Sequence, residues 1–186
     1  MNKDHQHTLL KAAKDAVNAA VHGRRAVGGD CTVPELNVRQ GCFVTLKNGE
    51  RLRGCIGQFT PDKTLIALVR EMAVAAAVRD PRFRRDPITP SELEQLDIEI
   101  SVLSAMERTD DPLSLELGKH GIYIVRGVQS GCFLPQVATE TGWSKEEFLD
   151  YCCAHKAGLP PDAWKHPDTE VYLFTADAFH AAYSDI

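Results

Sequence analysis

Residues 42–57 read Cys-Phe-Val-Thr-Leu-Lys-Asn-Gly-Glu-Arg-Leu-Arg-Gly-Cys-Ile-Gly. Two runs that alternate apolar and polar residues flank Asn48 and Gly49. An Asn-Gly step between alternating runs predicts a β-hairpin. We expect a three-residue loop at its tip, with Gly49 in the left-handed conformation of a bulged turn.

The hydrophobic pattern of this hairpin selects a register. In the bulged register Phe43 pairs with Arg53 and Val44 pairs with Leu52, so that one face of the hairpin becomes apolar. Arg53 and Cys55 then lie on the other face, two positions apart along one strand. The hairpin is therefore expected to present a cation and a thiol on the same side of the sheet.

The rest of the chain mixes helical and strand patterns without a regular alternation of the two. Helices are expected over residues 8–22, 62–78 and 144–155. Asp80-Pro81 is expected to end the second of these helices, and a capping box of Ser144 and Glu147 to open the third, which Gly158 closes. A capping box, Thr89-Pro-Ser-Glu92, is expected to open a further short helix. Strands are expected over residues 97–103, 121–127, 131–134 and 171–174, with a turn at Gln129-Ser130. This order favours an α+β fold with antiparallel sheets over a doubly wound parallel fold.

Composition excludes several classes of protein. The chain has 186 residues, 44% apolar and 25% charged, which is enough for a buried core. Its net charge is −5 and only 7% of its residues are aromatic, so a nucleic-acid surface is not expected. The longest apolar run, Met72–Val78, is far too short to span a bilayer. The N-terminus lacks the apolar segment of a signal peptide, so we expect a cytoplasmic location without membrane contact.

The six cysteines do not form a recognisable framework. They are sparse and include no Cys-x-x-Cys pair, which argues against a disulfide scaffold and against a zinc site. The chain also lacks the glycine-rich nucleotide loops, the nucleophile elbow and the metalloprotease motif. No metal and no cofactor is therefore predicted.

A series of short motifs resembles a known family. The string Leu-Arg-Gly-Cys-Ile-Gly at 52–57 is followed in order by Asp-Pro-Arg-Phe at 80–83, Ile98–Ser104, Gly118–Ile122, Phe133–Ala138 and Lys156–Leu159. Across residues 40–175 the chain is similar to the AMMECR domain family, whose prokaryotic members are called AmmeMemoRadiSam system protein A. The resemblance implies that residues 1–186 form one domain of two intertwined α+β subdomains. Each would be an antiparallel sheet with packed helices, the larger built from both the N- and C-terminal parts of the chain, with the LRGCIG string near their interface.

The resemblance also implies partners but supplies no established reaction. The family name points to a Memo-like protein and a radical-SAM protein. We therefore expect an accessory or recognition component that acts with these partners. It would bind a small molecule or a peptide through an interlobe cleft lined by Arg53 and Cys55.

A cysteine-dependent enzyme is the alternative. Cys55 would be a thiol nucleophile or a redox thiol, since a nearby cation such as Arg53 favours the thiolate or holds an anionic substrate. His120, in a glycine-flanked turn before a strand, would act as the base. The competing structural interpretation makes Cys55 a small buried residue, Arg53 the partner of a carboxylate such as Asp80, and His120 a turn residue.

The stretch 79–86 is dense in charge, with arginines and aspartates interleaved. It suits either a clamp for a carboxylate or phosphate, or a solvated ion-pair network that holds a loop. The pattern alone leaves both functions open.

Overall fold

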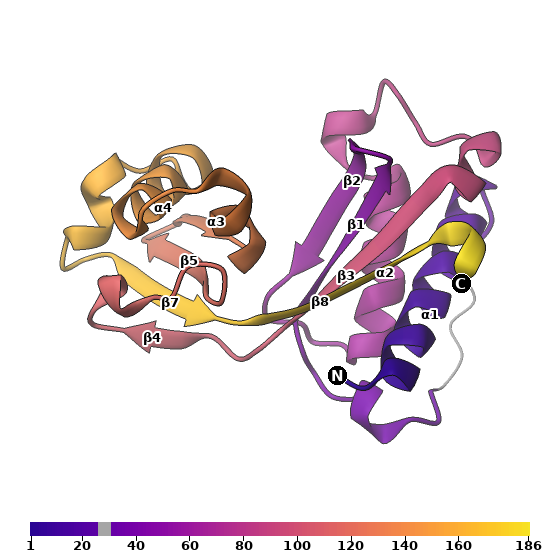
Figure 1. Cartoon of the computed structure of the whole chain (residues 1–186), viewed down its shortest axis with the longest axis horizontal. Coiled ribbons are helices and arrows are strands. Elements are labelled where there is room, and N and C mark those ends of the chain that lie inside the picture. The colour runs from indigo at the N-terminus through magenta and orange to yellow at the C-terminus, as the bar shows by residue number, and fades with distance from the viewer. Residues whose placement is uncertain (26–30) are drawn as a thin grey trace. The chain divides into compact units, whose positions relative to one another are not determined.

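The computed structural model describes residues 1–25 and 31–186 and divides into two compact units. Unit 1 combines Met1–Leu103 with Asp177–Ile186, and unit 2 is Ser104–Ala176. Each unit contains a four-stranded antiparallel sheet with packed helices (Figure 1). The predicted α+β fold class is confirmed, and the larger unit does draw on both ends of the chain.

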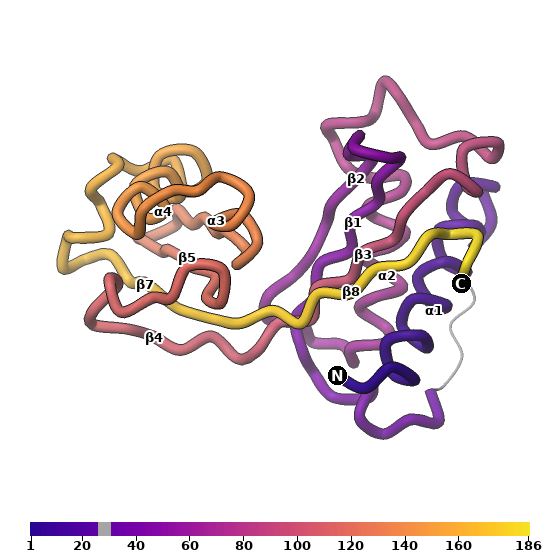
Figure 2. Tube along the Cα trace, in the orientation of Figure 1, coloured from indigo at the N-terminus to yellow at the C-terminus, as the bar shows by residue number. Residues whose placement is uncertain are grey.

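Unit 1 is a sheet covered by two helices. Its strand order is β2 (Arg51–Gln58), β1 (Cys42–Asn48), β3 (Leu96–Leu103) and β8 (Ala176–Ala182). The helices α1 (Lys3–Val21) and α2 (Leu65–Val78) lie side by side and pack on this sheet (Figures 1 and 2). The alternating apolar residues of β1 and β3 are fully buried beneath them, as the period of two requires.

The termini of the chain meet in unit 1. The Met1 amino group forms an ion pair with Asp177, at 2.5 Å. Lys14 of α1 donates hydrogen bonds to the carbonyls of Tyr183 and Ile186. These contacts hold β8 and the C-terminal turn on the first helix, which is why the two ends of the sequence share one core.

The predicted hairpin register is wrong, and the predicted faces hold only for the residues from Gly54 onward. Val44 pairs with Ile56 and Thr45 pairs with Cys55, four residues away from the predicted partners. Gly49 has the expected positive φ, 56°. From Gly54 to Gln58 the shift is by four residues, an even number, so these side chains keep their predicted faces and the hydrophobic pattern there cannot separate the two registers. The observed register pairs β2 as far as Gln58 and therefore forms a longer ladder.

A bulge in β2 restores the alternation beyond the turn. Leu46 pairs with Gly54 and Lys47 pairs with Leu52, so Arg53 is the extra residue between them. Simple alternation therefore does not determine the side on which Arg53 lies. Its contacts, described below, do.

The close approach of α2 explains why the first glycine of the LRGCIG string, Gly54, is a glycine. A Cβ atom on Gly54 would lie 2.0 Å from the carbonyl oxygen of Ala76. Only glycine lets the helix backbone come this near the strand. Beyond Ala76 the helix ends at Val78, before Asp80-Pro81 as predicted.

Unit 2 has the strand order β4 (Glu107–Thr109), β7 (Glu170–Phe174), β5 (Gly121–Arg126) and β6 (Gln129–Phe133). Its helices are α3 (Pro135–Thr141) and α4 (Lys145–Cys152), and α4 continues as a π-helical turn to Ala157. The capping box of Ser144 and Glu147 is confirmed. The β5–β6 turn lies at Gly127-Val128, two residues before the predicted turn, because Gly127 supplies the positive φ of 61°.

Among the α-helices and strands of the described residues, α3, β4 and β8 were not expected from the sequence. In addition, the helix expected from residue 90 is a short 3₁₀-helix, Pro90–Gln95, and Thr89 does not cap it with its side chain. Within the described part of the chain, no helix combines the length and the apolar character needed to cross a membrane.

Candidate functional site

Arg53 is the buried centre of an ion-pair network whose outer members, Asp86 and Arg51, are exposed. Its side chain is only 2% exposed. Its Nε donates to Oε1 of Glu92 at 2.6 Å and its Nη2 donates to Oε2 at 3.1 Å, a bidentate arrangement. Its Nη1 donates to Asp86 at 2.8 Å, and Arg51 binds the same carboxylate oxygen. All three nitrogens of the Arg53 guanidinium therefore donate to carboxylates of this chain.

The charges of this network stabilise one another. Hydrogen bonding to Glu92 raises the pKa of Arg53 above its ordinary value. Burial raises the pKa of Glu92, but the hydrogen bonds from Arg53 and Asn48 outweigh burial and hold that pKa below its usual range. Glu92 therefore serves the ion pair, and a hydrogen bond from the Thr89 backbone to its carboxylate supplies one half of the predicted capping box. Arg53 positions the β2 strand against the 3₁₀-helix.

Asp80 organises the backbone around Cys55. Its Oδ2 accepts a hydrogen bond from the backbone N–H of Cys55 at 3.0 Å. The same carboxylate binds Arg82 through Nε, at 3.0 Å, and through Nη2, at 2.6 Å. Nη2 of Arg82 also donates to the Cys55 carbonyl at 3.1 Å. The peptide groups on both sides of the Cys55 Cα are therefore tied to one Asp-Arg pair.

The electrostatics of this pair are those of a buried anion beside an exposed cation. The Asp80 side chain is 1% exposed, and the Arg82 side chain is 54% exposed. The Arg82 hydrogen bond lowers the pKa of Asp80 to about 2, with help from the backbone N–H of Cys55. The bond to Asp80 raises the pKa of Arg82, and the neighbouring Cys55 thiol adds a smaller contribution.

The Cys55 thiol is half-buried on the face of the sheet opposite α2. Thr45, its cross-strand partner, donates a hydrogen bond from Oγ1 to Sγ at 3.2 Å. The thiol is thus hydrogen-bonded to a neutral hydroxyl of the neighbouring strand, and the cation beside it is Arg82. The cation expected there from the sequence was Arg53.

His120 lies in unit 2, in the turn before β5. Its Nδ1 accepts a hydrogen bond from the backbone N–H of Glu116 at 3.0 Å, which places the proton of the neutral ring on Nε2. His120 lines a cavity of about 470 Å³ together with Glu107, Arg108 and the end of β7. The pairing of His120 with Cys55, and the interlobe cleft around Arg53 and Cys55, stay predictions.

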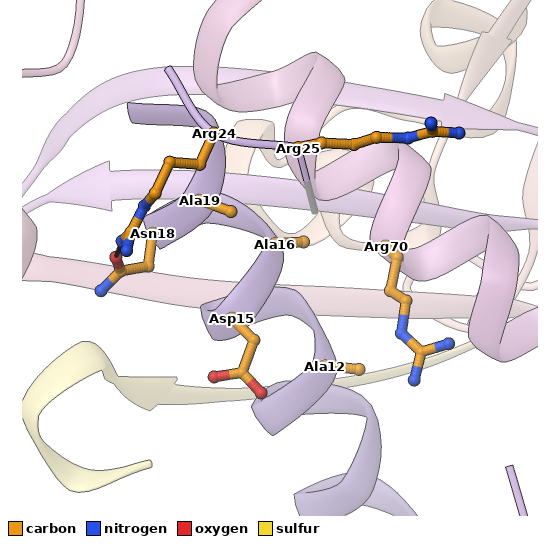
Figure 3. Close-up of a pocket in the computed structure, with 8 residues that line it drawn as sticks. All are labelled: Ala12, Asp15, Ala16, Asn18, Ala19, Arg24, Arg25 and Arg70. Carbon is orange, nitrogen blue, oxygen red and sulfur yellow. Dashed lines mark hydrogen bonds between the residues drawn. The ribbon is translucent and has the colours of Figure 1, made fainter. Parts of the chain in front are cut away.

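A second cavity, of about 450 Å³, lies between α1 and α2 (Figure 3). Three alanines of α1 form one wall, and Arg24, Arg25 and Arg70 reach its rim. The side chains of Arg24 and Arg25 extend in opposite directions, and Arg24 is hydrogen-bonded to Asn18 at 2.8 Å (Figure 3). Because these cations do not converge, the cavity lacks a common anchor for one anion.

Cys55 and Arg53 were thus predictable from the sequence, but the groups that surround them were not. Asp80 and Arg82 stand in the Asp-Pro-Arg-Phe motif, which was quoted for the resemblance and not as part of a site. A buried acid two residues before an arginine, at the end of a helix, could have suggested a local Asx-type contact. Glu92 and Thr45 carry no comparable signal, because only the fold brings them to β2.

Three comparisons relate this chain to known proteins. The AMMECR1 family model matches residues 10–179. A protein of Methanothermobacter thermautotrophicus is 42% identical over 97% of this chain and 96% of its own length. A protein of Thermococcus gammatolerans is 41% identical over 94% of this chain and 89% of its own length.

The crystal structure of protein PH0010 from Pyrococcus horikoshii is similar along the whole fold. Its TM-score is 0.86 at 39% sequence identity, and the match covers 95% of this chain and 91% of that chain. The motif series, the fold and these relatives agree. The chain belongs to the AMMECR1 family.

Proposed function

We propose that this protein is a recognition component whose binding surface is centred on Cys55 and Arg82. The observation that carries the proposal is the Asp80–Arg82 pair, which holds both peptide groups of Cys55 while leaving the guanidinium exposed. A rigid backbone with one exposed cation beside a half-buried thiol is a prepared contact surface.

The ligand chemistry follows from Arg82. An exposed guanidinium held flat by a carboxylate keeps further N–H donors for a carboxylate or a phosphate. Arg53 is not available for this role, because Glu92 and Asp86 occupy its fork. We therefore propose an anionic group, on a small molecule or on a peptide, as the species that meets this surface.

The proposed partners are a Memo-like protein and a radical-SAM protein. They come from the family resemblance, and the Cys55–Arg82 surface is where we propose that one of them, or a ligand shared with it, makes contact. An accessory role agrees with a site whose charged residues are mainly engaged in holding the β2 strand.

Co-purification tests the proposal. Tagged full-length chain is co-expressed with the Memo-like protein, or with the radical-SAM protein, of the same organism. We expect a complex with at least one of them that Arg82→Gln weakens about tenfold, as loss of a charged contact at an interface does. Cys132→Ser and Arg39→Gln are matched controls that retain the complex. A wild-type chain that binds neither protein, or an Arg82 variant that binds as well as the controls, contradicts the proposal.

A cysteine-dependent enzyme is the second candidate, favoured by the position of Arg82 beside the Cys55 thiol. In this version Cys55 is the nucleophile or redox thiol, Arg82 joins Arg53 as electrostatic support, and His120 is the base. The two candidates differ in iodoacetamide labelling. An enzyme requires Cys55 to react far faster than the half-buried Cys132, with a rate that falls in Arg82→Gln.

A further inference from the structure

The loop 79–86 carries four arginines, and most of them are unpaired. Arg79, Arg84 and Arg85 are exposed, and no ion pair or hydrogen bond among the described residues engages their side chains. Arg82 alone is paired within the loop, to Asp80. The loop thus differs from a closed ion-pair network, one of the two interpretations that its interleaved sequence allowed.

Both acidic side chains of the loop, Asp80 and Asp86, already form ion pairs. Asp80 is buried and accepts hydrogen bonds from Arg82 and from the Cys55 backbone. Asp86 binds the buried Arg53 and also Arg51. Neither carboxylate remains to neutralise the other arginines. The surface beside Cys55 is therefore locally basic, although the whole chain has a net charge of −5.

The loop also has an apolar centre. Phe83 is half-buried between these arginines, and the Arg82 guanidinium lies over its ring, 5.5 Å from the centroid. Arginine and aromatic side chains are the residue types that dominate binding energy at protein interfaces. The two ends of the loop are fixed, at Asp80 by the β2 backbone and at Asp86 by Arg53, so little ordering is needed on binding.

From these observations we propose that the loop 79–86 is a docking site for an acidic segment of a partner protein. The inference rests on the proposed recognition function and names the chemistry of the partner. A protein is favoured over a nucleic acid because the loop offers one aromatic ring, and a strand of nucleic acid needs a longer track of cations and stacking surfaces. Electrostatic steering by the arginines would speed the encounter and orient the partner toward Cys55.

Fluorescence anisotropy tests this docking site. The probe is a fluorescein-labelled decapeptide of aspartate and glutamate with a central leucine, titrated with the full-length protein at 50 mM salt. We expect saturable binding that weakens about tenfold in Arg79→Gln/Arg84→Gln/Arg85→Gln, since each exposed pair contributes a few-fold in affinity. Raising salt to 500 mM shortens the screening length to roughly 4 Å and should remove most of the binding.

The matched control removes the same charge elsewhere on unit 1. Lys3→Gln/Lys11→Gln/Arg39→Gln replaces three exposed cations outside the loop and should leave peptide binding within about twofold. The variant Arg79→Lys/Arg84→Lys/Arg85→Lys keeps the three charges and should retain most of the affinity for the peptide. Equal binding by the loop and control variants overturns the docking site. Tighter, loop-dependent binding of a labelled single-stranded oligonucleotide overturns the choice of a protein partner.

Failure of the docking site can be distinguished from failure of the proposed function. If the loop variant still co-purifies with the Memo-like or radical-SAM protein while Arg82→Gln does not, the Cys55–Arg82 surface stands and the docking loop fails. If the loop binds the acidic peptide but wild-type protein binds neither partner, the loop stands and the proposed partners fail. Thermal unfolding of each variant confirms that the fold is retained.

Discussion

Two hairpins of this molecule contain the same glycine-cysteine step. In β2 it is Arg53-Gly54-Cys55, and in β6 it is Ser130-Gly131-Cys132. In each unit the glycine touches helical backbone: an added Cβ would lie 2.0 Å from the Ala76 carbonyl in the first and 2.4 Å from the Ala157 nitrogen in the second. Both cysteines are half-buried.

The surroundings of the two steps differ. Arg53 is buried in bonds to Glu92 and Asp86, whereas Ser130 is exposed. Cys55 has Asp80 and Arg82 bound to its backbone, and Cys132 lies across from Tyr123. In β2 and β6 the glycine of this step therefore serves to pack a helix closely against the strand. The ion-pair network, present around the first step, is what distinguishes a candidate site from a packed strand.

The largest expected effect is loss of the buried ion pair. Arg53→Met should lower the free energy of unfolding by about 3 kcal/mol, because it leaves the largely buried Glu92 without its charged partner. The matched change, Ser130→Ala, should cost less than about 0.5 kcal/mol. Urea unfolding of both variants measures the contrast. A loss below 1 kcal/mol for Arg53→Met would show that Glu92 is readily resolvated.

The glycines should behave alike. Gly54→Ala forces a methyl group against the Ala76 carbonyl and should cost about 3 kcal/mol, and Gly131→Ala should cost about 2 kcal/mol at its slightly wider contact. The urea midpoint measures both. A harmless Gly54→Ala combined with a damaging Gly131→Ala would break the comparison, since it would give the first glycine a role other than helix packing.

Asp80 should make stability depend on pH. Its pKa falls from 3.8 to about 2 in the folded protein, so its stabilisation is complete above the unfolded pKa and is lost as pH drops through 4 toward 2. Asp80→Asn should cost roughly 2 kcal/mol at pH 7. The deficit should shrink as unfolding is measured at successively lower pH. The exposed Asp110→Asn is the control, and a deficit independent of pH would assign the loss to packing.

The smallest effect concerns the half-buried thiols of the two compared strands, Cys55 and Cys132. Burial raises the pKa of Cys42 to about 12 and that of Cys153 to about 11, so these thiols should react slowly with iodoacetamide. Under the recognition proposal Cys55 and Cys132 should be labelled at rates within about threefold of each other between pH 6 and 9. Peptide mapping of labelled protein gives the rates. Cys55 labelled at least tenfold faster, and slowed by Arg82→Gln, favours the enzyme.

Local chemistry made much of the fold predictable. The period of two in β1 and β3, the left-handed glycines at 49 and 158, the capping box at Ser144 and the stop at Asp80-Pro81 are all observed. Each depends on residues within a few positions of one another. The elements that were missed are short, like β4, or consist largely of alanine, like β8, and their pairing with distant strands stabilises them.

The candidate site likewise has a part that the sequence predicts and a part that depends on the fold. The sequence by itself determined that a thiol and an arginine stand near each other on a hairpin strand, and that the chain resembles a known family. Only the tertiary structure decided which charges meet: Glu92 and Asp86 reach Arg53 from 39 and 33 residues away, and Arg82 reaches Cys55 from 27. Ion pairing depends on distance in space and on burial, and neither quantity is set by the separation of residues along the chain.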